Sequence, residues 1–276
     1  MSQRPGHLVV IGGAEDKKGE CKILREFVRL SGGPRARIVV MTVATELPLE
    51  VGAEYMEVFD RIGVEDVRTF DVSNRANANA ESAVKAIEKA TGVFFTGGDQ
   101  VRITNLLGGT KIDAILHKRH EEGMVLGGTS AGASMMSNIM IIEGEPETNP
   151  RLGAVEMGAG MEFIPGVVID QHFAQRGRIG RLLSAVAKYP HHLGIGIDEN
   201  TALLLKDHVF EVIGDGAVTV LDAGAMTYSN APGLHNNDNL AMCGIVIHVL
   251  PAGYRFHLRE RTPVIETGNQ ADRTRS

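Results

Sequence analysis

The stretch MVLGGTSAGASMM, Met124–Met136, places one serine between glycines where an apolar strand-like run meets a helix-like run. Within it, Gly128–Gly132 reads Gly-Thr-Ser-Ala-Gly and fits the G-x-S-x-G pattern of a nucleophile elbow. In such an elbow the backbone turns so sharply that only the small size of glycine is tolerated on either side of the serine. The pattern is short, so its meaning depends on the flanking chain and on partner residues.

The chain around the elbow alternates between short apolar runs and longer amphipathic runs. Seven short runs predict strands, at 7–13, 36–44, 67–72, 92–98, 124–128, 166–172 and 193–198. Nearly all are continuously apolar, which is typical of parallel strands covered on both faces. Helical patterns lie between them, at 21–30, 50–62, 81–90, 101–107, 112–121 and 179–188. The alternation predicts an α/β fold with a doubly wound, mainly parallel sheet flanked by helices.

The pattern changes after Thr201. The stretch 201–224 has strand-like runs broken at 206–207 and 214–216 and predicts antiparallel β-hairpins; the stretch 243–260 predicts another hairpin. We expect these C-terminal antiparallel β-hairpins to extend the sheet rather than to form a second domain. The expected organisation is a single α/β domain over 1–265, followed by a disordered polar tail over 266–276.

Composition excludes several classes of function. The 276 residues are 43% hydrophobic and 22% charged, as in a globular protein with a sizeable core. The net charge of −6 provides no broad phosphate-binding surface, so we expect no nucleic-acid partner. No apolar run is long enough for a membrane span, and the start MSQRPGHLVVIGG does not match a signal peptide, which predicts a cytoplasmic protein without a membrane partner. Two cysteines and no H-E-x-x-H pattern argue against a metal site.

Chemistry-bearing residues follow four predicted strands. In open α/β sheets, ligands bind beyond the carboxyl ends of the strands. Those ends lead into Thr96–Gln100, the elbow, Asp170–His172 and Asp198–Asn200. Together they supply a serine, a histidine, carboxylates and a Gly-Gly turn, which are the parts of a serine hydrolase.

Ser130 is the candidate nucleophile, and His172 is the candidate base because it ends a predicted core strand. Asp198 and Glu199 both qualify as the acid that orients the base. Adjacent strand residues point to opposite faces, so only one of the two should face the histidine, and the sequence alone does not choose between them. Asp170 is a further candidate.

Backbone donors for an oxyanion are expected beside the elbow. They are the Ala131 N–H, directly after the nucleophile, and an N–H of Gly97 or Gly98. Gly97 and Gly98 also serve as a tight strand-to-helix turn, and the two roles are compatible.

An arginine cluster, Arg176, Arg178 and Arg181, follows the candidate base. Arg178 and Arg181 share a helix face, and a guanidinium matches a carboxylate in bidentate fashion. We expect the cluster to recognise a carboxylate, with a solvated surface as the alternative. The glycine-rich stretch 142–165 is expected to form a loop that covers the site as a lid or wall. Its glutamates would meet a cationic group; they are Glu143, Glu145, Glu147, Glu156 and Glu162.

Four motifs together resemble the cyanophycinases, serine peptidases grouped with the aspartyl dipeptidases, on a fold similar to class I glutamine amidotransferases. The motifs are Thr96–Gln100, Gly127–Ala133, Asp170–Phe173 with the three arginines, and Gly196–Ala202. They occur in order, and the resemblance runs over nearly the whole chain. The amidotransferases carry cysteine at the elbow, and aspartyl dipeptidases usually carry aspartate as the third catalytic residue.

The resemblance implies hydrolysis of cyanophycin, a poly-aspartate with arginine on its β-carboxyls, to β-Asp-Arg dipeptides through an acyl-enzyme. It implies a triad of Ser130, His172 and Glu199, oxyanion donors at Ala131 and Gly98, no cofactor, and a homodimer. The substrate pocket would be lined by Gln100, Asp170, Gln171, Arg178 and Arg181. Two alternatives remain: an aspartyl dipeptidase or isoaspartyl peptidase of the same fold, and a non-catalytic binding protein.

Overall fold

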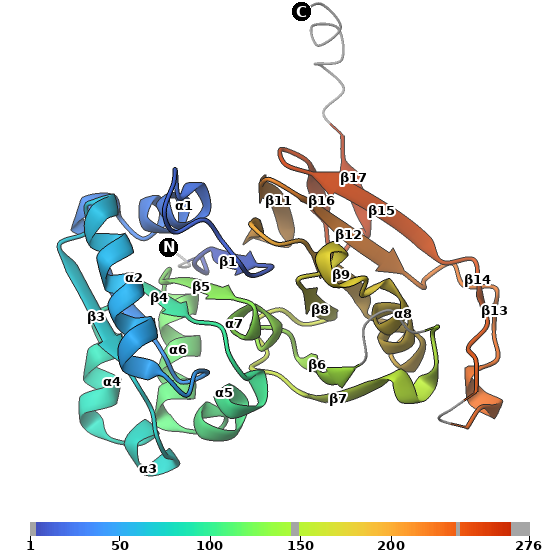
Figure 1. Cartoon of the computed structure of the whole chain (residues 1–276), viewed down its shortest axis with the longest axis horizontal. Helices are drawn as coiled ribbons and strands as arrows, with labels where there is room; N and C mark the ends of the chain where they lie inside the picture. Colours follow the sequence, from blue (N-terminus) through green and yellow to red (C-terminus); the bar gives the residue numbers. More distant parts are fainter. Residues whose placement is uncertain (1–3, 145–148, 236–237, 266–276) are drawn as a thin grey trace, which may run out of the picture.

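The computed structural model describes residues 4–144, 149–235 and 238–265. The expected disordered tail, 266–276, lies outside these residues. The described chain is built on two larger sheets that lie side by side, with helices on their outer faces (Figure 1).

The nine-stranded sheet has a parallel half and an antiparallel half. The parallel half runs in the order β1 (Leu8–Ile11), β5 (Val125–Thr129), β4 (Gly92–Phe95), β2 (Arg37–Met41) and β3 (Asp66–Phe70). On the other side of β1 the sheet continues, antiparallel, through β10 (Thr201–Lys206), β11 (Val209–Gly214), β16 (Arg255–His257) and β17 (Thr262–Val264). The mainly parallel, helix-flanked α/β architecture is confirmed.

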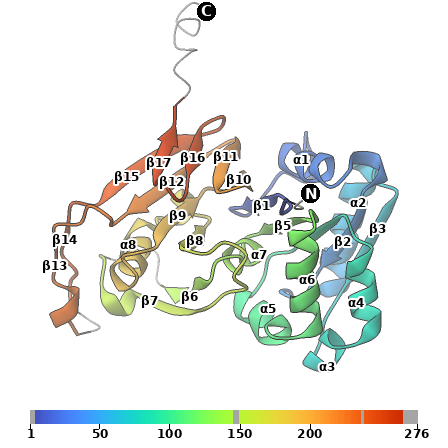
Figure 2. The same cartoon turned by 180° about the vertical axis from the view of Figure 1, so that it is seen from behind.

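Helices cover both faces of the parallel half. On one face lie α1 (Lys22–Leu30) and α2 (Pro48–Ile62); on the other lie α4 (Glu81–Glu88), α5 (Gln100–Leu107) and α6 (Lys111–Glu121), with the short α3 (Arg75–Ala78) beside them (Figures 1 and 2). Side chains of β1 alternate between the two layers, with Val9 and Ile11 packed toward α1 and Leu8 and Val10 toward the opposite core. Continuously apolar strands are therefore needed, because both faces are buried.

The four-stranded sheet has the order β15 (Val246–Pro251), β12 (Ala217–Asp222), β9 (Leu193–Ile197) and β8 (Val167–Gln171), and α8 (Ile179–Lys188) packs on one face. The other face packs on the antiparallel half of the large sheet, where Ile195 and Ile197 share a core with Leu203 and Val212. The two predicted strands at 166–172 and 193–198 are present and parallel to each other, but they belong to this second sheet.

The hairpin prediction is correct at one turn and wrong at two. β10 and β11 form the expected hairpin around 207–208. No hairpin forms at 215–216, because β12 pairs with β9 instead of with β11. No hairpin forms at 252–254 either, because β15 pairs with β12 and β16 pairs with β11. The strand β9 is buried along its length and has β8 on only one side, so its second edge needs a partner, which β12 provides.

Part of the stretch 142–165, which the sequence predicted to be a loop, consists of strands; residues 145–148 lie outside the described chain. β6 (Ile139–Gly144) and β7 (Val155–Ala159) form a two-stranded antiparallel ribbon in which Glu143 faces Glu156. The apolar, β-branched start of the segment favours a strand. Short elements complete the chain: α7 (Ala131–Ser134), β13 (Tyr228–Ser229), β14 (Met242–Cys243) and the 3₁₀ turns at 33–35, 152–154, 174–176 and 231–233.

Among the described residues, no helix has both the length and the apolar character needed to cross a membrane.

Candidate active site

The strand–turn–helix of the nucleophile elbow is present where the sequence placed it. Ser130 follows β5 with φ 53° and ψ −111°, a backbone conformation that a non-glycine residue rarely adopts, and α7 begins at the next residue. A Cβ on Gly128 would stand 2.2 Å from the carbonyl oxygen of Gly132, and a Cβ on Gly132 would stand 2.4 Å from that of Phe95. The two glycines are thus required because strand, turn and helix approach so closely.

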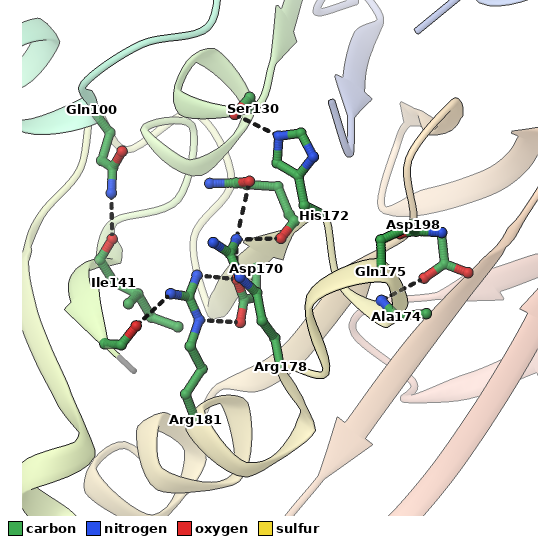
Figure 3. A network of polar contacts seen from close by, with 12 residues as sticks. Gln100, Ser130, Ile141, Asp170, His172, Ala174, Gln175, Arg178, Arg181 and Asp198 are labelled. Atoms are coloured by element: carbon green, nitrogen blue, oxygen red, sulfur yellow. Dashed lines mark hydrogen bonds and ion pairs between the residues drawn. The ribbon is translucent and has the colours of Figure 1, made fainter. Parts of the chain in front are cut away.

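Three strand ends bring Ser130, His172 and Glu199 together. The Ser130 Oγ lies 3.1 Å from His172 Nε2, and His172 Nδ1 lies 2.6 Å from Glu199 Oε1. Figure 3 shows the serine hydroxyl directed at the imidazole. His172 directly follows β8 and Glu199 lies two residues after β9, so the two sheets meet at this site. The chain of contacts is that of a nucleophile, a base and an orienting acid.

The other two candidate acids have different partners. Asp198 accepts hydrogen bonds from the backbone N–H groups of Ala174 and Ala217, both at 3.0 Å, and Figure 3 shows it directed away from the imidazole. Asp170 is buried under the arginine cluster. Within the described chain, Glu199 is the carboxylate that contacts His172.

The environment of His172 suits a general base. Burial lowers its pKa below the usual 6.5; the hydrogen bond that Nδ1–H donates to Glu199 opposes this shift, and the positive charge of Arg176 adds to it. The imidazole is therefore neutral near pH 7 and able to accept the serine proton.

Backbone N–H groups lie next to Ser130. Ala131 is the first residue of α7, so its N–H has no acceptor within the helix. Gly97 lies across from the elbow, with the position of its missing Cβ 3.4 Å from Ser130 Cβ. Gly98, at φ 142°, lines the same cavity as Ser130.

A cavity of about 860 Å³ opens beside Ser130 and carries charges of both signs. Its positive lining residues are Arg151, Arg176, Arg178 and Arg181, and its negative ones are Glu143 and Glu156. Gly98, Gln100 and Gln171 contribute to its walls. The cavity thus brings together the predicted nucleophile, the predicted arginines and part of the ribbon β6–β7.

Two members of the arginine cluster, Arg178 and Arg181, form a buried ion-pair network with Asp170, whereas Arg176 is exposed. Arg181 binds Asp170 with both ends of its guanidinium, Nε to Oδ2 at 2.8 Å and Nη2 to Oδ1 at 2.5 Å (Figure 3). Arg178 Nη1 donates to the carbonyl and the side-chain oxygen of Gln171, at 2.5 and 3.1 Å. Burial lowers the pKa of Arg178 to about 10, and Asp170 opposes the shift, so this guanidinium stays charged at neutral pH.

Asp170 therefore differs in position from the other predicted pocket residues. Its side chain is fully buried, and it is not part of the cavity wall. It holds Arg178 and Arg181, which do face the cavity.

Gln100, the first residue of α5, joins this helix to the cavity wall. Its Nε2 donates to the carbonyls of Ile141 and Ile142, both at 2.9 Å, and so ties α5 to β6 (Figure 3).

The acidic residues of the segment 142–165 divide between several places. Glu143 and Glu156 line the cavity, whereas Glu162 lines a different cavity, of about 510 Å³, near His117 and His120. Glu145 and Glu147 lie outside the described residues.

Arg151 is a cavity residue that sequence reasoning did not identify. It stands in the connection between β6 and β7, where its N–H donates to Ser184 Oγ at 3.0 Å. No motif marked it; the only signal was its place in the segment expected to cover the site. In the described part of the chain, no group of three or more histidine, cysteine, aspartate or glutamate side chains could hold a metal ion.

Known proteins are similar to this chain over most of its length. The chain is 40% identical to a cyanophycinase from Nostoc sp. over 257 residues, which is 92% of this chain and 86% of the relative. It is 40% identical to one from Geminocystis herdmanii, over 93% of this chain and 95% of the relative, and 36% identical to one from Synechococcus elongatus, over 93% and 81%.

Solved structures show the same fold at lower identity. A peptidase from an acI-B1 Actinobacterium superposes with a TM-score of 0.69 at 21% identity, covering 93% of this chain and 98% of that one. A putative peptidase E from Listeria monocytogenes gives a TM-score of 0.53 at 15% identity, covering 76% and 98%. The model of peptidase family S51 matches residues 8–213, which include Ser130, His172 and Glu199. The chain belongs to peptidase family S51.

Proposed function

We propose that this peptidase hydrolyses cyanophycin, releasing β-Asp-Arg dipeptides through a Ser130–His172–Glu199 triad. The main support for the proposal is the cavity beside Ser130, whose walls carry both arginines and glutamates. Each unit of the polymer carries a cationic guanidinium and a free α-carboxylate on its arginine, so both charges find partners there. The relatives named cyanophycinase support the same substrate.

The mechanism follows from the contacts at the elbow. His172 Nε2 takes the Ser130 proton as the hydroxyl oxygen attacks a backbone aspartyl carbonyl, and Glu199 stabilises the imidazolium that forms. The N–H groups of Ala131 and Gly98 would stabilise the oxyanion. His172 then returns the proton to the leaving amine, and water, activated by the same imidazole, releases the acyl-enzyme.

Substrate recognition is assigned to the cavity walls. Arg178 and Arg181, oriented by Asp170, together with Gln171, bind carboxylate and backbone groups of the substrate, while Gln100 fixes the opposite wall. The protein is proposed to act as a cytoplasmic homodimer without a cofactor; light scattering of the purified protein tests the dimer.

Rates on three soluble substrates test the proposal. The enzyme is expected to cleave a (β-Asp-Arg)₃ oligomer much faster than Asp-X dipeptides or an uncharged peptide of the same length. Faster cleavage of Asp-X dipeptides would identify an aspartyl dipeptidase. No cleavage of any of them, together with no labelling of Ser130 by a serine-reactive phosphonate, would indicate a binding protein.

A further inference from the structure

The end of β1 holds all three parts of the triad through its backbone. The carbonyls of three consecutive residues, Ile11–Gly13, accept hydrogen bonds from segments that carry the triad. The donors are Ser130 N–H to Ile11 at 3.0 Å, His172 N–H to Gly12 at 2.7 Å, and Asn200 N–H, directly after Glu199, to Gly13 at 2.9 Å. The strands β5, β8 and β9 belong to two different sheets, and hydrogen bonds to this one tripeptide fix the positions of their ends relative to one another.

The tripeptide is itself fixed to the elbow by a buried carboxylate. Glu15 is 5% exposed; its Oε2 accepts from Thr129 Oγ1 at 2.5 Å and its Oε1 from the Tyr55 hydroxyl. Thr129 is the residue before the nucleophile. The segment that follows β1 is therefore held against the strand that carries Ser130, independently of the three backbone hydrogen bonds.

Gly13 faces the working edge of the imidazole. It is buried at φ 97°, and a Cβ at this position would stand 2.4 Å from both Cε1 and Nε2 of His172. Ordinary van der Waals contact begins near 3.4 Å, so a methyl group would require the ring to move by about 1 Å (3.4 − 2.4). Nε2 is the atom that contacts Ser130 Oγ. The missing side chain of Gly13 thus sets where Nε2 can lie.

We propose that Gly13 is a positioning residue for the reaction: it acts through His172 by leaving the space in which Nε2 approaches Ser130. The proposal rests on the triad assigned under Proposed function. A substitution of Gly13 has two distinct effects: the backbone strain of a side chain at positive φ, and the collision of that side chain with the imidazole.

Gly63 offers a matched control. It caps α2 at φ 99°, close to the φ of 97° at Gly13, and nothing lies within 4 Å of its Cβ position. Gly63→Ala therefore carries the strain without the collision.

Activity of both variants is measured on the (β-Asp-Arg)₃ oligomer. Gly13→Ala is expected to lower kcat about 100-fold, with KM changed less than about threefold, because a displacement of about 1 Å at a reacting group costs that much. Gly63→Ala should leave both constants within about twofold of wild type. A folded Gly13→Ala enzyme with wild-type kcat, or one in which only KM changes, would overturn the proposal.

A thermal double-mutant cycle tests the collision without reference to turnover. In wild type, Gly13→Ala is expected to lower Tm more than Gly63→Ala does. In a His172→Ala background no ring remains to be displaced, so the two alanine variants should lower Tm equally. If Gly13→Ala alone does not fold, folding of Gly13→Ala/His172→Ala supports the proposal, and failure of both overturns it. Retained activity in Ser130→Ala would defeat the triad itself, whatever the cycle gives.

Discussion

Asp198 and Glu199 are neighbours in the chain but act on different parts of the molecule: Glu199 Oε1 lies 2.6 Å from His172 Nδ1, whereas both carboxylate oxygens of Asp198 accept backbone N–H groups. The contact of Glu199 fixes the orientation of the His172 imidazole, and the contacts of Asp198 join the turn after His172 to the start of β12.

These contacts predict opposite effects for two conservative substitutions. Glu199→Gln should lower kcat by roughly 10³–10⁴ with little loss of stability, because the amide cannot stabilise the imidazolium. Asp198→Asn should lower the free energy of unfolding by about 1–3 kcal/mol, since one backbone donor is left poorly satisfied, and should retain most of kcat. Kinetics and urea unfolding of both variants provide the check. Loss of activity in Asp198→Asn with Glu199→Gln unaffected would reverse the assignment.

The acid limb of the pH profile should report His172. Its pKa is lowered below 6.5 chiefly by burial, so the midpoint of the acid limb of kcat/KM should lie below pH 6.5. Arg176 also lowers this pKa, and removing its charge stabilises the imidazolium. Arg176→Gln is therefore expected to move the midpoint of the acid limb to higher pH. A midpoint that stays in place or moves down would show that another group titrates.

The network of Asp170 with Arg178 and Arg181 should matter to folding. Asp170→Ala leaves two buried guanidinium groups without their carboxylate and is expected to cost about 3–5 kcal/mol of unfolding free energy. Glu26→Ala, which breaks the exposed Glu26–Arg29 pair, is the control and should cost less than about 1 kcal/mol. Equal losses in the two variants would contradict a buried, stabilising network.

Glu143 and Glu156 face each other across β6 and β7 and line the cavity. If they receive the substrate guanidinium, Glu143→Gln/Glu156→Gln should reduce the preference for an arginine-bearing oligomer over its neutral citrulline counterpart by roughly 10-fold or more. Glu162→Gln, which changes a glutamate of the same segment in the other cavity, should leave the preference unchanged. An equal loss of rate on both oligomers would instead indicate damage to the cavity wall.

Much of this site could be predicted from the sequence because its parts stand at strand ends. The glycines around Ser130 mark a turn that only small residues permit, and His172 follows a run of buried apolar residues. Those local signals place Ser130 and His172 at strand ends without any knowledge of long-range contacts. The choice of Glu199 over Asp198 required the direction of two adjacent side chains at a strand end, which local pattern does not determine.

Other features depend on long-range pairing that hydrophobic patterns do not encode. β12 and β15 look like halves of hairpins, yet they pair with the second sheet because β9 needs a partner on its open edge. The arginines after His172 have the spacing of a solvated helix face, but Asp170 draws two of them into the core. The importance of Gly13 also appears only when the imidazole is placed against it.

Ser130 is proposed to attack cyanophycin in the cavity beside the elbow. The most direct measurement incubates the purified protein, and Ser130→Ala beside it, with cyanophycin and identifies the soluble products by mass spectrometry. Release of β-Asp-Arg dipeptides by the wild type, with the variant slower by roughly 10⁴–10⁶, is the predicted result. Equal release by both proteins would show that Ser130 is not the nucleophile, and no release by either would show that cyanophycin is not the substrate.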